Sequence, residues 1–374
     1  MIELTQLRKV HIIGIGGIGI SAVAHMLLEG NPQIGLSRCL VSGSDTALSL
    51  VTEGLRNKGA KIFTGHDPLQ VPQDADAVFY TVAVGEDNPE LLYAERRGIP
   101  TASYSEVLGM ISKNFYTIAV AGTHGKTTTT AMLGKILVDA GLDPTIMVGS
   151  LLKENGSNLV LGKSKYLVVE ADEYRKSFHS LVPSLLVITN IDEDHLDFYK
   201  DLNDIQRSFF DLAKKIPRGG ALVCNAEDPH LSLLVRESFS DVFDYGEESI
   251  SVKLLVPGEH NRNNARAALA AARILGVPEE VAVRSLAAFP GTWRRFEYRG
   301  AMKTGALVYD DYAHNPHKVR AALAGAREAF PDKKIVVVFR PHLYSRTKLL
   351  LREFGESFND ADQVIVADIY AARE

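Results

Sequence analysis

Short apolar runs rich in β-branched residues alternate with segments of helical periodicity along most of the chain. RKVHIIG, RCLVSG and DAVFYT each precede a helix-like stretch, the first of which is GISAVAHMLLEG. Parallel strands produce this alternation because each needs a long crossover, usually a helix, before the next strand can pair beside it. The pattern therefore predicts an α/β fold, and it stays regular to about residue 113.

The pattern then restarts twice. A strand-like run at 116–122 leads into a helical segment from Lys126 to Ala140, and an Ala-rich helical segment runs from Asn261 to Leu275. The sequence Phe-Pro-Gly at 289–291 breaks the periodicity before a third unit begins. Further strands are predicted at 166–171, 185–190, 221–226, 306–311, 334–339 and 362–368, and further helices at 316–329 and around 346–358. We predict three α/β domains, at residues 1–113, 114–297 and 298–374.

The third predicted domain is small. It offers about three strands, whereas a sheet usually has about five or six. The sequence stops at AARE, directly after a strand-like run. We interpret the C-terminal domain as truncated.

Composition narrows the class of protein. The chain has 374 residues, 46% of them hydrophobic and 23% charged, which is typical of a soluble globular protein with two or three domains. The net charge of -5 argues against a general nucleic-acid binder. Two cysteines, Cys39 and Cys224, are too few for a disulfide scaffold and fit a reducing compartment. Without a signal-like N-terminus or an apolar run of about 18 residues, we expect a cytoplasmic protein that does not insert into membranes.

A glycine motif follows the first predicted strand. Gly14, Gly16 and Gly19 form GxGxxG before a helix, and Asp45 closes SGSD after the second strand. The glycines allow a phosphate to approach the helix N-terminus. An acidic residue after the second strand binds a ribose in dinucleotide folds. NAD binding and a purely structural use of the glycines are both open alternatives. The motif indicates a nucleotide phosphate more firmly than it indicates which nucleotide.

The strongest signal is GTHGKTTTT at 122–130, between a strand and a helix. Backbone N–H groups of such a loop hold phosphate oxygens, Lys126 would reach the β- and γ-phosphates, and the Thr127 hydroxyl would bind Mg²⁺. Val120 stands where the strict GxxxxGK[ST] pattern has its first glycine. Strand, loop and helix nevertheless come in the required order, so we predict triphosphate binding.

Two acidic clusters follow the next predicted strands of the central unit. The first contains Glu170, Asp172 and Glu173, and the second is TNIDEDHLD at 189–197. The second cluster contributes Asp192, Asp194, His195 and Asp197. Sites in parallel sheets form at the carboxyl ends of strands, where a carboxylate and a histidine facing a triphosphate would complete a divalent-metal site. Solvated acidic turns are the alternative for each cluster taken alone.

Four further motifs carry polar residues. They are PGEHNRNNA (257–265), WRRFE (293–297), DDYAHNP (310–316) and RPHLYSRT (340–347). Helix capping explains the asparagines of the first equally well. An arginine at a domain joint, as in the second, is suited to clamping a phosphate between domains. Charged loops are the alternative for the remaining two.

The order of these motifs resembles the Mur ligase family of peptidoglycan synthesis. GIGGIG, GTHGKTTT, EADE, TNIDEDHLD, PGEHNRNNA, RRFE, DDYAHNP and PHLYSRT run from residue 14 to 347 and so cover nearly the whole chain. GIGGIGISAVA, GSD at 43–45, DNPEL at 87–91 and the histidine of GTHGK are most similar to members that add the first amino acid. The resemblance implies a Rossmann-like domain for the UDP of UDP-N-acetylmuramate, a P-loop ATPase-like central domain for ATP and Mg²⁺, and a Rossmann-like C-terminal domain for L-alanine. It implies ATP-dependent ligation through an acyl phosphate.

The resemblance also implies roles for individual residues. The catalytic set is Lys126, His195, Arg295 and Asp311, and the Mg²⁺ set is Thr127, Glu170 and His195. ATP would contact Gly122, Thr123, His124, Gly125, Lys126, Thr127, Thr128, Asn261, Asn264 and Arg295. The UDP-sugar would contact Gly14, Gly16, Gly17, Gly19, Ser44 and Asp45, while His314, His342 and Arg346 would face the substrates.

Three departures from the family pattern bear on activity. The third domain ends early, the stretch DYGEESISVKLLVPGEHN is short, and Arg175 stands where an acidic residue is common. A missing sheet edge in the second stretch would expose apolar surface and loosen alanine binding. Three alternatives therefore remain: a related ligase that adds a recycled peptide or another amino acid, an NAD-dependent oxidoreductase, and an inactive nucleotide-sugar-binding homologue.

Overall fold

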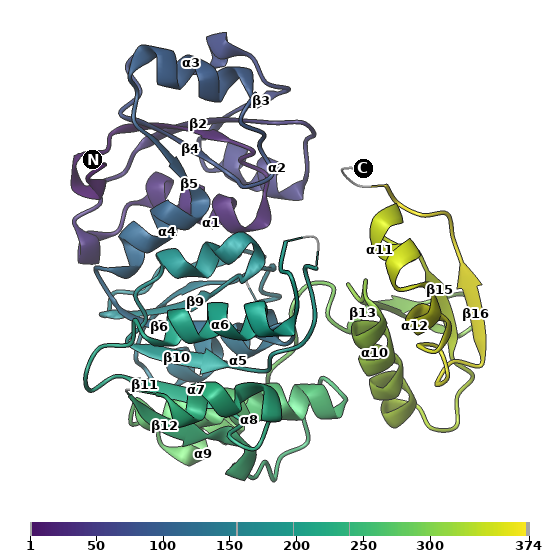
Figure 1. Ribbon diagram of the computed structural model, residues 1–374. Helices are drawn as coiled ribbons and strands as arrows, with labels where there is room; N and C mark the ends of the chain where they lie inside the picture. Colours follow the sequence, from purple (N-terminus) through teal and green to yellow (C-terminus); the bar gives the residue numbers. More distant parts are fainter. Residues whose placement is uncertain (1, 155, 197, 239, 372–374) are drawn as a thin grey trace.

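The computed structural model describes residues 2–371 except 155, 197 and 239, so Asp197 of the second acidic cluster lies outside the described residues. Figure 1 shows the first unit above the central one and the third unit to their side. The predicted α/β class is confirmed. Among the described residues, no helix combines the length and apolar character needed to cross a membrane.

The first unit is a five-stranded parallel sheet in the order β3-β2-β1-β4-β5. Its strands are β1 (Lys9–Ile13), β2 (Leu40–Asp45), β3 (Lys61–Thr64), β4 (Ala77–Tyr80) and β5 (Thr101–Ser103). Its helices are α1 (Ile18–Glu29), α2 (Leu50–Asn57), α3 (Pro89–Arg97) and α4 (Tyr104–Ser112). The strand order reverses at β1, so the glycine motif after β1 lies at the switch point where ligands bind in such sheets.

The central unit is a seven-stranded sheet in the order β12-β11-β10-β6-β9-β7-β8, parallel except for the β7–β8 pair. Its strands are β6 (Tyr116–Ala121), β7 (Thr145–Met147), β8 (Leu159–Val160), β9 (Tyr166–Glu170), β10 (Leu185–Ile188), β11 (Ala221–Cys224) and β12 (Asp241–Asp244). Its helices are α5 (Lys126–Asp139), α6 (Leu202–Ala213), α7 (Ser232–Arg236), α8 (Glu259–Ile274) and α9 (Glu279–Ala287). Strand β6 lies between β10 and β9, so the phosphate loop that follows it emerges between the two acidic clusters.

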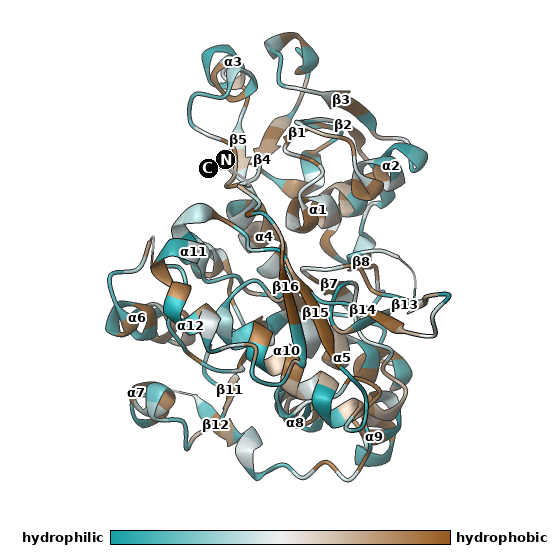
Figure 2. Ribbon diagram, turned by 90° about the vertical axis from the view of Figure 1, so that its right-hand side faces the viewer, coloured by the Kyte–Doolittle hydropathy of each residue, from teal (hydrophilic) through white to brown (hydrophobic). Residues whose placement is uncertain are grey.

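The third unit differs in detail from the sequence-based expectation. The predicted strand at 306–311 becomes β14 (Leu307–Asp310), which pairs antiparallel with β13 (Glu297–Ala301), while β15 (Val336–Phe339) pairs parallel with β16 (Gln363–Val366). The helix α10 (Pro316–Ala329) agrees with its prediction. The helix predicted around 346–358 is instead two short ones, α11 (Tyr344–Leu349) and α12 (Leu351–Gly355). Figure 2 shows β15 and β16 as strongly hydrophobic strands, and side chains such as Val338 and Val366 are 69% and 62% exposed.

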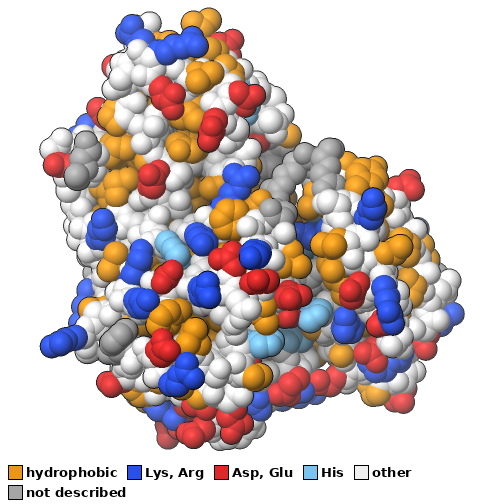
Figure 3. All heavy atoms as spheres, in the orientation of Figure 1, with side chains coloured by type: hydrophobic (Ala, Val, Ile, Leu, Met, Phe, Trp, Pro, Cys, Tyr) orange, Lys and Arg blue, Asp and Glu red, His pale blue; other side chains and the backbone are white. Residues whose placement is uncertain are grey.

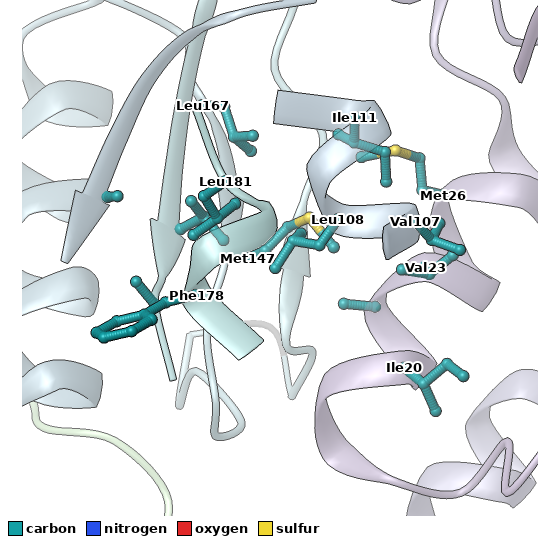
Figure 4. Close-up of a cluster of buried hydrophobic side chains, with 14 of the residues drawn as sticks. Ile20, Val23, Met26, Val107, Leu108, Ile111, Met147, Leu167, Phe178 and Leu181 are labelled. Atoms are coloured by element: carbon teal, nitrogen blue, oxygen red, sulfur yellow. The ribbon is translucent and has the colours of Figure 1, made fainter. Parts of the chain in front are cut away.

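The hydrophobic core is shared between two of the units. One continuous cluster joins helices α1 and α4 of the first unit to β7, β9 and the 3₁₀ segment Tyr174–Ser180 of the central unit. Figure 4 shows this junction, with Val23, Met26 and Leu108 facing Met147 and Leu181. The third unit has a separate small cluster, made of Val319, Leu323, Phe339 and Phe354. Apolar packing therefore holds the first and central units together, whereas the third unit has a core of its own.

Candidate active site

A cavity of about 750 Å³ lies where the three units meet. The first unit contributes Gly19 and Tyr104, the central unit Lys126, the third unit His314, and the segment that leads into the third unit Arg295. Figure 3 shows histidine and carboxylate side chains along the groove between the central and third units. A cavity lined by three units can hold several substrate parts at once and can change shape when the third unit moves.

The phosphate loop has a conformation that only glycine fits. Gly122 and Gly125 have φ of 132° and 85°, in the region that side chains rarely adopt. A Cβ atom on Gly125 would overlap Oδ1 of Asn264, and one on Gly122 would overlap Oγ1 of Thr189. Helix α5 begins directly after Gly125, so its free N–H groups and the positive end of its dipole face the loop.

Lys126 forms a buried ion pair with Glu173 at this loop. Its Nζ lies 2.7 Å from Oε2 of Glu173 and donates to the carbonyl of Gly122 at 2.6 Å. Burial raises the pKa of Glu173 to about 7, although the lysine opposes this. Burial by itself would lower the pKa of Lys126, but the three carboxylates around it more than reverse this effect and raise it. The lysine is therefore a fixed positive charge at neutral pH.

The predicted magnesium ligands divide into two groups. The Thr127 hydroxyl donates to Oε1 of Glu170 at 3.0 Å, and the second oxygen of Glu170 accepts the N–H of Gly149 at 2.8 Å. His195 lies instead against Glu173, with Nε2 3.7 Å from Oε1. Hydroxyl and carboxylate oxygens are the ligands that Mg²⁺ prefers, so Thr127 and Glu170 fit this ion. The ligand atoms of His195, Glu173 and Asp172 all lie within 4.8 Å of one another and form an adjoining group that can hold a cation.

The wall opposite the loop belongs to the third unit and the segment leading into it. Arg295 lies over the ring of Tyr312, 5.7 Å from its centre. Asp311 accepts the N–H of Phe296 at 2.8 Å, and burial raises the pKa of this carboxyl group. Lys318 lies 3.8 Å from Asp194, and burial lowers its pKa to about 8. These charged groups face the phosphate loop across the cavity.

Several predicted residues lie at the edge of the cavity or outside its lining. Gly17, Gly19, Asn261, Asn264 and His314 line it, as do residues 123–128 of the loop. The cavity lining does not include the predicted residues Gly14, Gly16, Ser44, Asp45, Gly122, His342 and Arg346. His342 lies beside His314, with ring centres 6.2 Å apart.

The carboxylate of Asp45 contacts the glycine motif itself. Its Oδ2 accepts the N–H of Gly16 at 2.8 Å, so in this structure it orients the turn after β1. Ser44 is fully buried and donates to Oε2 of Glu90, whose carboxylate also contacts His66 at 3.1 Å. Sequence reasoning gave no role to Glu90, Tyr104 or Lys318, although Glu90 lies within the DNPEL motif. Lys318 also had a signal nearby, since it follows DDYAHNP by two residues.

The geometry defines a multi-domain P-loop enzyme whose phosphate loop faces two other α/β units. Comparison with known families specifies the class further. The models for the Mur ligase family catalytic domain, the Mur ligase middle domain and the Mur ligase glutamate ligase domain match residues 9–116, 120–249 and 294–373. The chain belongs to the Mur ligase family.

Individual relatives agree with this assignment. The chain is 42% identical to the UDP-N-acetylmuramate–L-alanine ligase of Clostridium kluyveri, over 98% of this chain and 84% of that protein. The enzyme of the same name from Alkaliphilus metalliredigens is also 42% identical, over 99% of this chain and 84% of that protein. The crystal structure of UDP-N-acetylmuramate-alanine ligase from Thermotoga maritima matches with a TM-score of 0.82 at 31% identity, over 98% of this chain and 86% of that one.

Proposed function

We propose that this chain joins L-alanine to the carboxylate of UDP-N-acetylmuramate at the expense of ATP, in the cytoplasm, as a step of peptidoglycan precursor synthesis. The observation that carries the proposal is the loop of Lys126, which opens into a cavity lined by all three units. The names of the relatives at 42% identity supply the two substrates. In this proposal the glycine motif of the first unit binds the UDP-sugar, the central loop binds ATP, and the third unit binds the amino acid.

The chemistry follows from the weakness of a carboxylate as an electrophile. An amine does not displace its oxygen, so the γ-phosphoryl group of ATP is first transferred to it and gives an acyl phosphate. The amine then attacks the carbonyl carbon, phosphate leaves with the electron pair of the broken C–O bond, and the amine loses its proton. Positioning and charge stabilisation supply most of the catalysis in phosphoryl transfer.

The scheme gives roles to four residues of the cavity lining. Lys126 would exchange its contact with Glu173 for the phosphate oxygens, while Arg295 would meet them from the opposite wall. Thr127 and Glu170 would hold Mg²⁺, which offsets the charge of the triphosphate when it is bound. Closure of the third unit would exclude water from the acyl phosphate.

The test is phosphate release from ATP and Mg²⁺ with UDP-N-acetylmuramate, with and without L-alanine. We expect release to require both substrates, and to fall by at least about 100-fold in Thr127→Val, which removes a metal-binding hydroxyl while keeping the side-chain shape. Thr130→Val is the matched control, because Thr130 lies in the same helix but outside the cavity lining. Equal activity in the two variants would contradict the proposed role of Thr127.

The amine donor separates the proposal from its nearest rival. The murein peptide ligase of Psychrobacter arcticus shares the fold, with a TM-score of 0.75 at 24% identity. The test replaces L-alanine in the same assay by L-alanyl-γ-D-glutamyl-meso-diaminopimelate, the peptide in the name of a related ligase from Neisseria meningitides. Faster release with the tripeptide than with L-alanine would overturn the assignment to L-alanine.

A further inference from the structure

A second group of metal-binding side chains lies where the central unit meets the first turn of α10. His124 belongs to the phosphate loop, Asp192 lies after β10, and His317 is the second residue of α10. Their ligand atoms all lie within 4.8 Å of one another. Nδ1 of His317 is 2.7 Å, and Nε2 of His124 is 3.4 Å, from the same oxygen of Asp192. The three side chains therefore converge on one point from two units of the protein.

The ring of His124 makes no hydrogen bond of normal geometry, although its Nε2 lies 3.4 Å from Asp192. Both of its nitrogens are shielded from solvent. Its main chain is nevertheless firmly held, since the N–H donates to Oδ1 of Asn190 at 2.9 Å and the carbonyl accepts from Nδ2 at 3.0 Å. A buried polar atom without a hydrogen bond costs about 1–3 kcal/mol, so the two shielded ring nitrogens point to a ligand that completes them.

The carboxylate between the two histidines is oriented by the backbone. Oδ1 of Asp192 accepts the N–H of Glu193 at 2.8 Å, and the N–H of Asp192 itself donates to Oγ1 of Thr123 at 2.9 Å. These contacts leave Oδ2 directed at His124 and His317. Hydrogen bonds that fix a ligand's orientation are the usual support of a metal site.

The ligand types indicate which class of ion would bind. Two imidazoles and one carboxylate suit Zn²⁺, Co²⁺ and related ions, whereas Mg²⁺ prefers oxygen ligands throughout. With bonds of about 2.1 Å, ligand atoms around a tetrahedral ion are roughly 3.4 Å apart. Nδ1 of His317 is closer than this to Asp192, at 2.7 Å, and its side chain, which is 55% exposed, has room to turn toward that spacing. The nearby charge of Lys318 opposes a cation, but this lysine is itself close to Asp194.

We propose that His124, Asp192 and His317 bind a divalent transition metal of the zinc class. The ion would tie α10 of the third unit to the phosphate loop of the central unit, because each side supplies at least one ligand. This site is separate from the Thr127 and Glu170 pair proposed for Mg²⁺, and it does not depend on the reaction that the chain catalyses.

Co²⁺ is the probe that tests the site, because its visible absorption reports imidazole ligands and low coordination numbers directly. We would titrate it into the whole chain in the presence of excess Mg²⁺. We expect visible bands in the unmodified chain and their loss in His317→Gln, since the half-exposed side chain of His317 can be replaced without disturbing a packed core. His195→Gln is the matched control: it removes any Co²⁺ bound by the adjoining Asp172 and Glu173 group, and the bands of the proposed site should remain.

Two results would overturn the site. One is the absence of bands in the unmodified chain, and the other is their loss in His195→Gln with retention in His317→Gln. Hydrogen exchange tests the tie between the units separately. Zn²⁺ should slow exchange in α10 of the unmodified chain but not of His317→Gln, and equal exchange rates with and without the ion would refute the tie.

Discussion

Lys126 and Glu173 form an ion pair that burial makes sensitive to pH. The side chain of Glu173 is 3% exposed, and its pKa is raised to about 7. In Lys126→Met the carboxyl group loses its partner, so its pKa should rise further and the group should stay neutral in the folded chain. A carboxyl group whose pKa is raised by folding stabilises the folded state at low pH, and this contribution is lost as the pH rises. Above pH 7 the free energy of unfolding should therefore fall by up to about 1.4 kcal/mol per pH unit more in the variant than in the parent chain.

Thermal unfolding at pH 6 and pH 8.5, without nucleotide or metal, measures this effect. The difference in midpoint between Lys126→Met and the parent chain should be larger at pH 8.5. Adding Glu173→Gln to the variant removes the titrating group and should remove the extra loss. A midpoint difference that is equal at both pH values would refute the coupling.

The candidate site could be read from the sequence only where its residues share a local motif. Lys126 and Thr127 were predicted because a glycine loop before a helix has a characteristic order of residues. The pairing of Lys126 with Glu173 spans 47 residues, and the approach of His317 to Asp192 joins two units of the chain. No periodicity encodes such contacts, because they depend on how the strands are ordered in the sheet and how the units dock.

At the scale of elements, the turn from β6 into α5 depends on the absence of a side chain. Gly125 has φ of 85°, and a Cβ atom there would also overlap Asn264. Gly141, after the other end of α5, has φ of 74° but no atom within 4 Å of the Cβ position. Gly125→Ala should therefore weaken ATP binding by at least about tenfold, while Gly141→Ala should cost only about 1 kcal/mol of stability and leave binding unchanged.

Isothermal titration with a non-hydrolysable ATP analogue and Mg²⁺ compares the two variants. Both variants place a side chain at a positive φ, so a difference between them reports what is particular to the loop, where the Cβ atom meets Asn264. Binding that is unchanged in Gly125→Ala, or reduced equally in both variants, would show that the loop tolerates a side chain at this position.

The hydrophobic periodicity of the sequence predicts helices and strands that bury many residues. It does not predict short strands, which are defined by their hydrogen-bonded pairing alone. Strands β6 and β10 are continuous apolar runs because both faces of the central sheet are covered, and both were predicted. Strands β5 and β8 have three and two residues, too few to show any alternation. The division of the third unit into an antiparallel and a parallel pair was also missed, because β13 begins in the charged motif WRRFE and carries two exposed residues in its centre.

At the scale of the whole molecule, the three units are joined by two kinds of contact. The first and central units share one apolar core, to which Leu108 of α4 and Leu181 contribute. The third unit meets α8 through polar contacts, including Arg262 of α8 and Glu328 of α10 at 2.7 Å. Because both of these side chains are more than a third exposed, the ion pair adds little to stability. Motion of the third unit against a rigid pair of the other two is the movement that these contacts permit.

Calorimetry of the chain without ligands should therefore show two transitions. The third unit should unfold first, because its small core buries less apolar surface, and the first and central units should unfold together. Leu108→Ala, at the shared core, should lower only the midpoint temperature of the second transition, with a loss of about 2–5 kcal/mol of stability. Phe354→Ala, in the core of the third unit, should lower only the midpoint temperature of the first transition, with a similar loss of stability. If Leu108→Ala separated the first unit into a transition of its own, the shared core would not couple the two units. If Phe354→Ala lowered both transitions, the third unit would be part of one cooperative body and closure would have to arise elsewhere.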